Sequence, residues 1–206
     1  MDLCGGMSRC SPILTGLFDT VDVCDLKPSF GDTPPGKRGR LITSNLKDIG
    51  EHIQFQKYSC IYGNWALCYL GYQEMVQVLI VLRMSIYDNG SMILKEPILN
   101  EGESTPRLCR TGQWLLTRSA DEIERHLLDN FFILKRQDLT QVRGVDRQRI
   151  WYLKGRPIVS PLRKPTCSVK HVYHMAKYWY CLQNQVHEQC QHEECTMRNH
   201  SIKTLK

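Results

Sequence analysis

The chain opens with Met1-Asp2-Leu3-Cys4-Gly5-Gly6-Met7-Ser8-Arg9, and this stretch decides which fold the sequence specifies. A short apolar run with an acidic residue is followed by a glycine pair, and Ser11-Pro12 then starts a helical pattern that continues to Phe18. A strand, a tight glycine turn and a helix N-terminus in this order bind nucleotide-like ligands, because glycine lets the backbone approach a ligand closely. On its own, a glycine pair after a strand predicts no more than a turn.

A second apolar stretch, Val21-Asp22-Val23-Cys24-Asp25, strengthens this interpretation because it also ends in a carboxylate. In doubly wound folds an acid about 20 residues after the glycine turn binds ribose hydroxyls, so Asp25 is the predicted ribose ligand. Asp22 is expected to point to the opposite face of the sheet, because side chains alternate along a strand. The alternative interpretation of Asp25 is that it caps a turn formed by its own backbone.

The run resembles the cofactor site of class I S-adenosylmethionine-dependent methyltransferases, in particular the alpha N-terminal protein methyltransferases. The first motif of that family reads Asp-x-Gly-x-Gly-Ile-Gly-Arg, and four positions match here: Asp2, Gly6, Met7 and Arg9. Cys4 and Ser8 occupy two of its glycine positions. The resemblance implies a doubly wound, mostly parallel α/β sheet with an antiparallel final strand and a shortened first strand. It also implies S-adenosylmethionine as cofactor, with Arg9 on the methionine carboxylate and Asp25 on the ribose.

The resemblance extends to about residue 155 and implies further site residues. Leu46 and Lys47 follow the expected third strand, where the family contacts the adenine edge. The run 63–70 is similar to the family's Gln-Trp segment, so Asn64 is implied to face the cofactor. Trp65 is implied to form an aromatic wall beside the amino terminus of a protein substrate.

Periodicity and breaker residues predict the remaining elements. Strands are expected at 41–47, 58–62, 91–96, 131–134 and 149–153, and helices at 12–18, at 73–86 and from 119 onward. Residues 88–90 read as a turn, and residues 97–113 as a long loop of the kind that covers an active site. The segment 31–40 contains three glycines and two prolines, which exclude a helix there.

Methylation of an α-amine needs groups that hold the amine and accept its proton. The resembled family places a His, an Asp and an Asn around it; the His corresponds to Tyr69 and the Asn to Pro97. One alignment puts Gln113 at the Asp position, and another puts Glu103 there. Glu103 and Tyr69 are therefore the catalytic candidates. The alternative is a methyltransferase fold kept as a non-catalytic interaction subunit, which would act with a partner subunit.

The start of the chain carries a further expectation. Two helices precede the first strand in the resembled family, whereas this sequence begins at the last residues of that strand. A central strand shortened in this way loses buried ladder hydrogen bonds. A fragment, an alternative product or a partner-dependent subunit would each account for it.

Composition narrows the function classes. The 206 residues are 42% apolar and 23% charged with a formal net charge of +6, as in a globular protein with a sizeable core. The longest apolar stretch, 75–86, is too short to span a membrane, and no membrane association is expected. Mild basicity is common among globular proteins, so no nucleic-acid partner is expected. The scattered cysteines predict a reducing compartment, either cytoplasm or nucleus.

The sequence changes in character near residue 158. Residues 1–158 are expected to form the methyltransferase-like domain, and residues 159–206 a basic tail rich in His and Cys, without fixed structure. The tail contains two His-x-x-Cys pairs, with His187, Cys190, His192 and Cys195 as candidate zinc ligands. Structural zinc sites usually separate their ligand pairs by a longer loop, which favours a polar tail without metal. A small zinc or nucleic-acid module in this tail is the weaker alternative.

Overall fold

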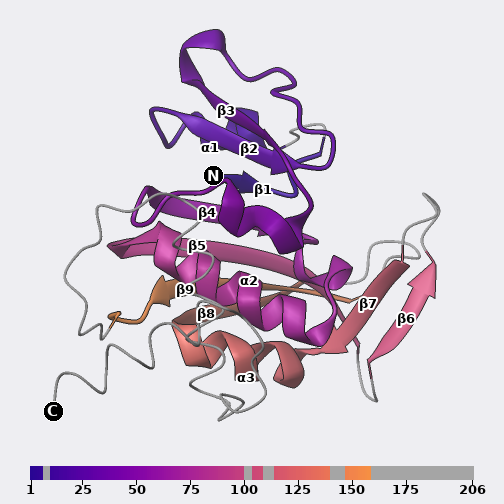
Figure 1. Cartoon of the computed structure of the whole chain (residues 1–206). Coiled ribbons are helices and arrows are strands. Elements are labelled where there is room, and N and C mark those ends of the chain that lie inside the picture. Colours follow the sequence, from indigo (N-terminus) through magenta and orange to yellow (C-terminus); the bar gives the residue numbers. More distant parts are fainter. Residues whose placement is uncertain (7–9, 100–103, 109–113, 140–146, 159–206) are drawn as a thin grey trace, which may run out of the picture.

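A nine-stranded sheet forms the centre of the molecule (Figure 1). The computed structural model describes residues 1–6, 10–99, 104–108, 114–139 and 147–158. The strands are β1 (Asp2–Leu3), β2 (Val21–Asp25), β3 (Arg38–Thr43), β4 (Tyr58–Asn64), β5 (Ile86–Leu99), β6 (Thr105–Leu108), β7 (Trp114–Ser119), β8 (Phe131–Leu139) and β9 (Gln148–Gly155). The helices are α1 (Ser11–Leu14), α2 (Tyr72–Ser85) and α3 (Ala120–Asn130), with 3-10 turns η1 (Pro35–Lys37), η2 (Leu46–Glu51) and η3 (Leu67–Tyr69).

Five parallel strands make up the main part of the sheet in the order β3-β2-β1-β4-β5. β9 lies antiparallel beside β5, and β8 pairs with β9, also antiparallel. The last two residues of β5 pair in parallel with β7, which forms an antiparallel pair with β6. This topology confirms the predicted α/β class, a doubly wound, mostly parallel sheet with an antiparallel final strand.

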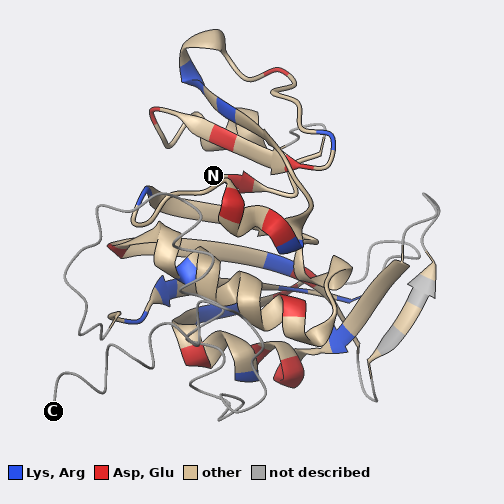
Figure 2. Ribbon diagram, viewed as in Figure 1, with Lys and Arg blue, Asp and Glu red and all other residues tan. Residues whose placement is uncertain are grey.

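The main hydrophobic core lies on the face of the sheet that α2 and α3 cover (Figure 1). α2 carries few charged residues (Figure 2), and its Met75, Leu79 and Leu82 have no exposed surface. A helix that is apolar around most of its circumference must be buried, as the sequence predicted. A smaller cluster on the opposite face joins Leu14 of α1 to Val21 and Val23 of β2. None of the described helices is long and apolar enough to cross a membrane.

The central strand β1 has only two residues, yet it is paired on both sides. Asp2 and Leu3 pair in parallel with β2 and with β4. The carbonyl of Met1 continues the ladder by accepting the N–H of Tyr62 at 2.8 Å. Leu3 has no exposed surface and belongs to the main core. The shortened first strand therefore still joins the two halves of the sheet.

Asp22 attaches the edge strand β3 to the rest of the sheet. Its carboxylate accepts the backbone N–H of Arg40 at 2.8 Å, Lys57 Nζ at 3.2 Å and the Tyr58 hydroxyl at 2.9 Å. Burial alone would raise the pKa of Asp22, but these hydrogen bonds outweigh it and lower the pKa. Arg38 and Arg40 are exposed along β3, and no α-helix forms within residues 31–40, as expected.

The expected turn at residues 88–90 was wrong. These residues lie inside β5, which begins at Ile86. Tyr58 of β4 lies opposite Ile86, but Cys60, two residues later, lies opposite Ser91. Residues 87–90 of β5 therefore face the single residue Ser59 and form a bulge. A bulge and a turn favour the same residue types, which explains why Asp-Asn-Gly was misread.

The expected loop at 97–113 is in part strand. β5 continues to Leu99, and β6 and β7 form a hairpin beyond it. Within the expected loop, β6 forms because residues 105–108 pair antiparallel with β7, a contact that no local pattern in the loop indicates. α1 was predicted too long, because the exposed Ile13 and Leu17 leave no continuous apolar stripe. The third strand was predicted to start at residue 41 but starts at 38.

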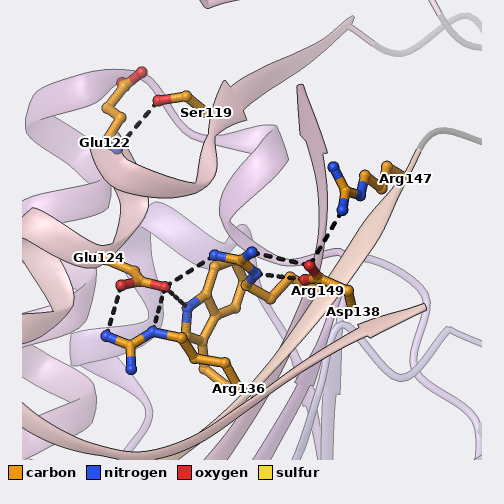
Figure 3. Close-up of polar contacts among 8 residues, drawn as sticks. Ser119, Glu122, Glu124, Arg136, Asp138, Arg147 and Arg149 are labelled. Atoms are coloured by element: carbon orange, nitrogen blue, oxygen red, sulfur yellow. Dashed lines mark hydrogen bonds and ion pairs between the residues drawn. The ribbon is translucent and has the colours of Figure 1, made fainter. Parts of the chain in front are cut away.

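The expected start of α3 at Ser119 is confirmed. The Ser119 hydroxyl accepts the N–H of Glu122 at 3.2 Å, which caps the helix (Figure 3). The predicted final antiparallel pair is also present, and both strands are longer than expected.

A charged network ties α3 to the β8–β9 hairpin (Figure 3). Glu124 of α3 accepts Arg136 Nε at 2.8 Å, Arg149 Nη1 at 3.2 Å and Trp151 Nε1 at 2.8 Å. Asp138 accepts Arg149 Nε at 2.6 Å. Burial alone would raise the pKa of Glu124, but the hydrogen bonds from Arg136 and Trp151 outweigh it and lower the pKa. Glu124 is therefore charged, and the network intact, at neutral pH.

The bulge of β5 yields a packing prediction. A Cβ at Gly90 would lie 2.5 Å from Ile86 Cγ2 and 2.9 Å from the Ser59 carbonyl oxygen. Gly90→Ala is expected to lower the free energy of unfolding by about 1–3 kcal/mol, because overpacking forces backbone shifts. Urea unfolding followed by circular dichroism measures it, with Gly36→Ala as the control, since nothing lies within 4 Å of a Cβ there. Equal unfolding midpoints for the two variants would contradict the packing.

Candidate functional site

A cavity of about 930 Å³ opens at the carboxyl ends of the parallel strands. Doubly wound folds bind their ligands at this edge. Its lining comes from the turn after β1, the ends of β2 and β4, the start of η2, and residues of β5, β7 and β9. The lining residues are Asp2, Cys4, Gly5, Gly6, Cys10, Cys24, Asp25, Leu26, Ser44, Asn45, Leu46, Tyr62, Asn64, Trp65, Tyr69, Lys95, Trp114 and Gln148.

The turn after β1 is tight and brings backbone to the cavity wall. Cys4 and Gly6 have φ angles of 57° and 54°, in the left-handed region. Gly6 adopts this conformation without steric cost, whereas Cys4 is strained by about 1–2 kcal/mol. Gly5 is constrained differently, because a Cβ there would lie 2.9 Å from Asp2 Cγ.

Asp2 has one unsatisfied oxygen at the cavity. The side chain is 1% exposed, and its Oδ2 accepts the Ser11 hydroxyl at 2.6 Å. Its Oδ1 is buried and has no hydrogen-bond partner in the described part of the chain. Burial raises the pKa of Asp2, and the bond from Ser11 opposes this. Buried polar atoms are nearly always paired, so this oxygen is available to a donor in the cavity.

Asp25 joins the end of β2 to the glycine turn. Its Oδ2 accepts the N–H of Gly6 at 3.0 Å, and its Oδ1 accepts the N–H of Lys27 at 3.1 Å. The second bond is the turn cap considered as an alternative from the sequence. A carboxylate has about four acceptor positions, so the two backbone bonds leave capacity for ligand hydroxyls. Asp22, by contrast, is not among the residues that line the cavity.

The other side of the cavity is formed by the segment after β4. Trp65 has a φ of 55°, and its N–H donates to the Lys95 carbonyl at 2.8 Å. Asn64 Oδ1 is buried without a hydrogen-bond partner in the described part of the chain. Tyr69 is 41% exposed, and both Tyr69 and Trp114 of β7 line the cavity.

Glu96 lies beneath this segment and binds its backbone. The carboxylate is 1% exposed. It accepts the N–H groups of Ala66 at 2.7 Å, Leu67 at 2.9 Å and Cys68 at 3.2 Å. Burial raises the pKa of Glu96 to about 7, although the three N–H groups lower it.

Most of the predicted site residues meet at one cavity. Those that line it are Gly6, Asp25, Leu46, Asn64, Trp65 and Tyr69. Lys47 is exposed and is not part of the lining, because η2 turns Leu46 inward and the next residue outward. The candidates Arg9, Glu103, Gln113, His187, Cys190, His192 and Cys195 lie outside the described residues. Pro97 is buried in β5 opposite Gln148.

Sequence reasoning missed several residues of the site. Ser44 and Asn45 follow β3 directly, and Lys95 lies near the end of the parallel part of β5. The rule that ligands bind beyond the carboxyl ends of parallel strands could have identified them. Gln148 could not have been found in this way, because it begins the antiparallel β9. No cluster of three or more His, Cys, Asp or Glu side chains suited to a metal occurs in the described ranges.

Comparison with solved structures finds this architecture in known methyltransferases. A Leishmania major protein described as a SAM-dependent methyltransferase of the DUF858 family gives a TM-score of 0.59 at 17% identity, covering 74% of this chain and 63% of that one. The Burkholderia thailandensis 1,6-didemethyltoxoflavin-N1-methyltransferase, with bound S-adenosylhomocysteine, gives 0.63 at 11% identity, covering 76% and 70%. A Mesorhizobium loti S-adenosylmethionine-dependent methyltransferase gives 0.61 at 12%, covering 75% and 89%.

The fold is that of the class I S-adenosylmethionine-dependent methyltransferases. The chain spans 63% of the length of the Leishmania methyltransferase structure. Identities below one fifth establish the fold and leave the acceptor substrate to be inferred from the site. No protein-family model and no curated protein matches the sequence.

The residues present fit the cofactor of this methyltransferase fold. Asp2 Oδ1 and Asn64 Oδ1 are buried acceptors without partners in the described chain, and both belong to cavity-lining residues. Gly6 has space for a ligand, since among the described residues a Cβ there would meet only Asp25 Oδ2, at 4.0 Å. Asp25 would hold the ribose hydroxyls, and Leu46 would contact the adenine.

The buried Glu96 predicts an unusual pH dependence of stability. The pKa of Glu96 is about 7 in the folded protein, above its ordinary value of 4.5. The contribution of Glu96 to the free energy of unfolding is therefore fully present below pH 4.5 and is lost as the pH rises through about 7. The unfolding free energy of Glu96→Gln minus that of the wild type should therefore increase by about 2 kcal/mol from about pH 5 to about pH 8. Urea unfolding across this range measures the difference.

The difference between Glu96→Gln and the wild type reports on Glu96 alone, because the other titratable groups around it are the same in the variant and in the wild type. They are Arg118 of β7, Arg149 opposite Glu96 on β9, Cys68 of η3 and Cys4 of the glycine turn. A difference that does not change with pH would contradict a raised pKa for Glu96.

Proposed function

We propose that the protein is an S-adenosylmethionine-dependent methyltransferase that methylates the α-amine of a protein amino terminus. The observation that carries the proposal is the cavity at the strand ends. On one of its sides Asp25 and Gly6 are joined by a hydrogen bond, and Asn64 and Trp65 lie on the other. The amine acceptor is supported by the similarity of residues 63–70 to the alpha N-terminal protein methyltransferases. The partner is then the amino terminus of another protein, in the cytoplasm or nucleus.

The two sides of the cavity would have separate tasks. When bound, S-adenosylmethionine supplies a methyl group activated by its sulfonium. The chain must then hold a neutral amine in line with that methyl and let one proton leave. An α-amine has an ordinary pKa of about 7.7–8.0, so a useful fraction is neutral near pH 7 without a strong base.

The residues near the acceptor can meet these demands. Trp65 offers an aromatic surface that excludes water, and the Tyr69 hydroxyl can accept a hydrogen bond from the amine. Tyr69 is 41% exposed, so a released proton can pass to solvent. Glu103, which the sequence offers as a base, lies outside the described residues.

Asp25→Ala tests the cofactor assignment. A charge-assisted bond to ribose hydroxyls contributes about 1.5–3 kcal/mol, so the affinity for S-adenosylmethionine should fall by about one to two orders of magnitude. Loss of the acceptor for Gly6 and Lys27 should also lower the free energy of unfolding by about 1–2 kcal/mol. Titration calorimetry and thermal unfolding on the same sample measure both effects.

Asp22→Asn is the matched control, since it alters a carboxylate of the same strand that faces away from the cavity. It should lower stability and leave cofactor affinity unchanged. If Asp25→Ala behaved in the same way, Asp25 would be a turn cap and the ribose role would be wrong. Failure of the folded wild type to bind millimolar S-adenosylmethionine would remove the whole proposal.

A non-catalytic interaction subunit is the second candidate function. It is favoured by Pro97, which is buried where the resembled family has an Asn, and by the strained Cys4 where the family has glycine. Incubation with an Xaa-Pro-Lys amino-terminal peptide, followed by mass spectrometry, separates the two candidates. Cofactor-dependent methylation by the isolated chain would eliminate the second candidate.

A further inference from the structure

Two buried side chains, Glu96 and Arg118, hydrogen-bond the backbone of the segment after β4 (residues 65–70). Glu96 binds three N–H groups of the segment, as described above, and Arg118 binds its carbonyl groups. Arg118 of β7 is also 1% exposed, and it donates to the carbonyls of Leu67 at 3.0 Å and Leu70 at 2.5 Å. Arg118 Nε in turn lies 3.2 Å from Glu122 Oε1 of α3. Residues 65–70, hereafter the acceptor wall of the cavity, are thereby held to β5 by Glu96, to β7 by Arg118 and, through Arg118, to α3.

We propose that Glu96 and Arg118 are positioning residues for the acceptor: they fix residues 65–70 in the conformation that places Trp65 and Tyr69 at the cavity. This role rests on the proposed function in one respect, namely that the molecule bound beside residues 65–70 is the amine that accepts the methyl group. The Glu96 carboxylate accepts hydrogen bonds from N–H groups of the segment, and the Arg118 guanidinium donates hydrogen bonds to its carbonyl groups. The pair therefore fixes the backbone conformation of the segment without contacting a ligand.

The segment needs this support because its own bonds are weak. Trp65 has a left-handed φ, which a bulky side chain rarely adopts unless its surroundings impose it. Inside the segment, the Tyr69 N–H reaches the Ala66 carbonyl only at 3.4 Å, and the Leu70 N–H reaches the Leu67 carbonyl at 3.1 Å. These contacts form a single 3-10 turn, whose hydrogen-bond geometry is poor.

The cofactor side is held by other hydrogen bonds. Asp25 bonds Gly6, and Ser11 bonds Asp2, at the ends of β1 and β2. The hydrogen bonds given above for Glu96 and Arg118 go to residues 66–70 instead. A loosened acceptor wall should therefore weaken acceptor binding and spare cofactor binding.

Two buried cysteines allow a test that does not depend on activity. Cys68 lies in the acceptor wall and is 3% exposed, whereas Cys24 lies in β2 and is 2% exposed. In native protein treated with iodoacetamide and mapped by mass spectrometry, the ratio of Cys68 to Cys24 labelling rates is the readout. Because burial and the Glu96 carboxylate both raise the pKa of the Cys68 thiol, local opening of the segment is read from Glu96→Ala relative to Glu96→Gln, which removes the same charge. Glu96→Ala leaves three N–H groups without an acceptor, and should raise this ratio by at least about tenfold.

Two further variants define the role. Glu96→Gln keeps an amide oxygen for Ala66 and Leu67 and should restore the ratio to within about threefold of the wild type. Asp22→Asn removes a buried charge elsewhere and should leave the ratio unchanged. If Glu96→Ala yields no soluble protein, Arg118→Lys carries the same test, because lysine cannot hold both carbonyls in a fixed fork.

The binding measurements complete the test. In Glu96→Ala or Arg118→Lys, the affinity for S-adenosylhomocysteine should stay within about threefold of the wild type, while KM for an Xaa-Pro-Lys peptide rises at least about tenfold. Labelling of both cysteines in proportion, or equal loss of cofactor and acceptor binding, would overturn the positioning role. A wild type that binds no S-adenosylhomocysteine would defeat the proposed function alone, since the labelling ratio would still decide the role of the pair.

Discussion

The structure depends on two residues of backbone at the centre of the sheet. Asp2 and Leu3 pair with β2 on one side and with β4 on the other, and no other described strand connects those halves. Both residues are almost fully buried, so their hydrogen bonds have no competing water. The same two residues lead directly into the tight turn at the cavity. The ladder that closes the sheet therefore also fixes the turn against which a cofactor would lie.

The cavity is organised by carboxylates that bind backbone N–H groups. Asp25 holds the turn after β1, and Glu96 holds the segment after β4, on opposite sides of the cavity. Such bonds are charge-assisted and roughly twice as strong as neutral ones, which suits loops that carry little secondary structure of their own. The cost is desolvation, and it is largest for the deeply buried Glu96, whose pKa rises accordingly.

Local periodicity was sufficient to predict that the parallel strands, α2 and α3 exist, although not all of their bounds, and the position of Asp25 at the end of its strand followed from the same pattern. Asn64 was found only through the family resemblance. Local periodicity was not sufficient for the β6–β7 hairpin or the bulge in β5, since both are decided by pairing with distant strands. Glu96 and Arg118 were overlooked as a pair for the same reason. They are separated by more than twenty residues, and only the fold brings both to residues 66–70.

The edge strand β3 has a consequence for assembly. β3 pairs only with β2 among the described strands, so its outer edge presents unpaired backbone groups that another chain could extend. Arg38 and Arg40 are exposed along it, and Gly39 between them weakens its strand propensity. Two copies meeting edge to edge in antiparallel register would bring arginines of like charge together. Arg40 is paired with Asp22 at 3.1 Å, so among the described residues the uncompensated charge at this edge is that of Arg38, which together with Gly39 makes β3 a poor edge for sheet extension by a second copy.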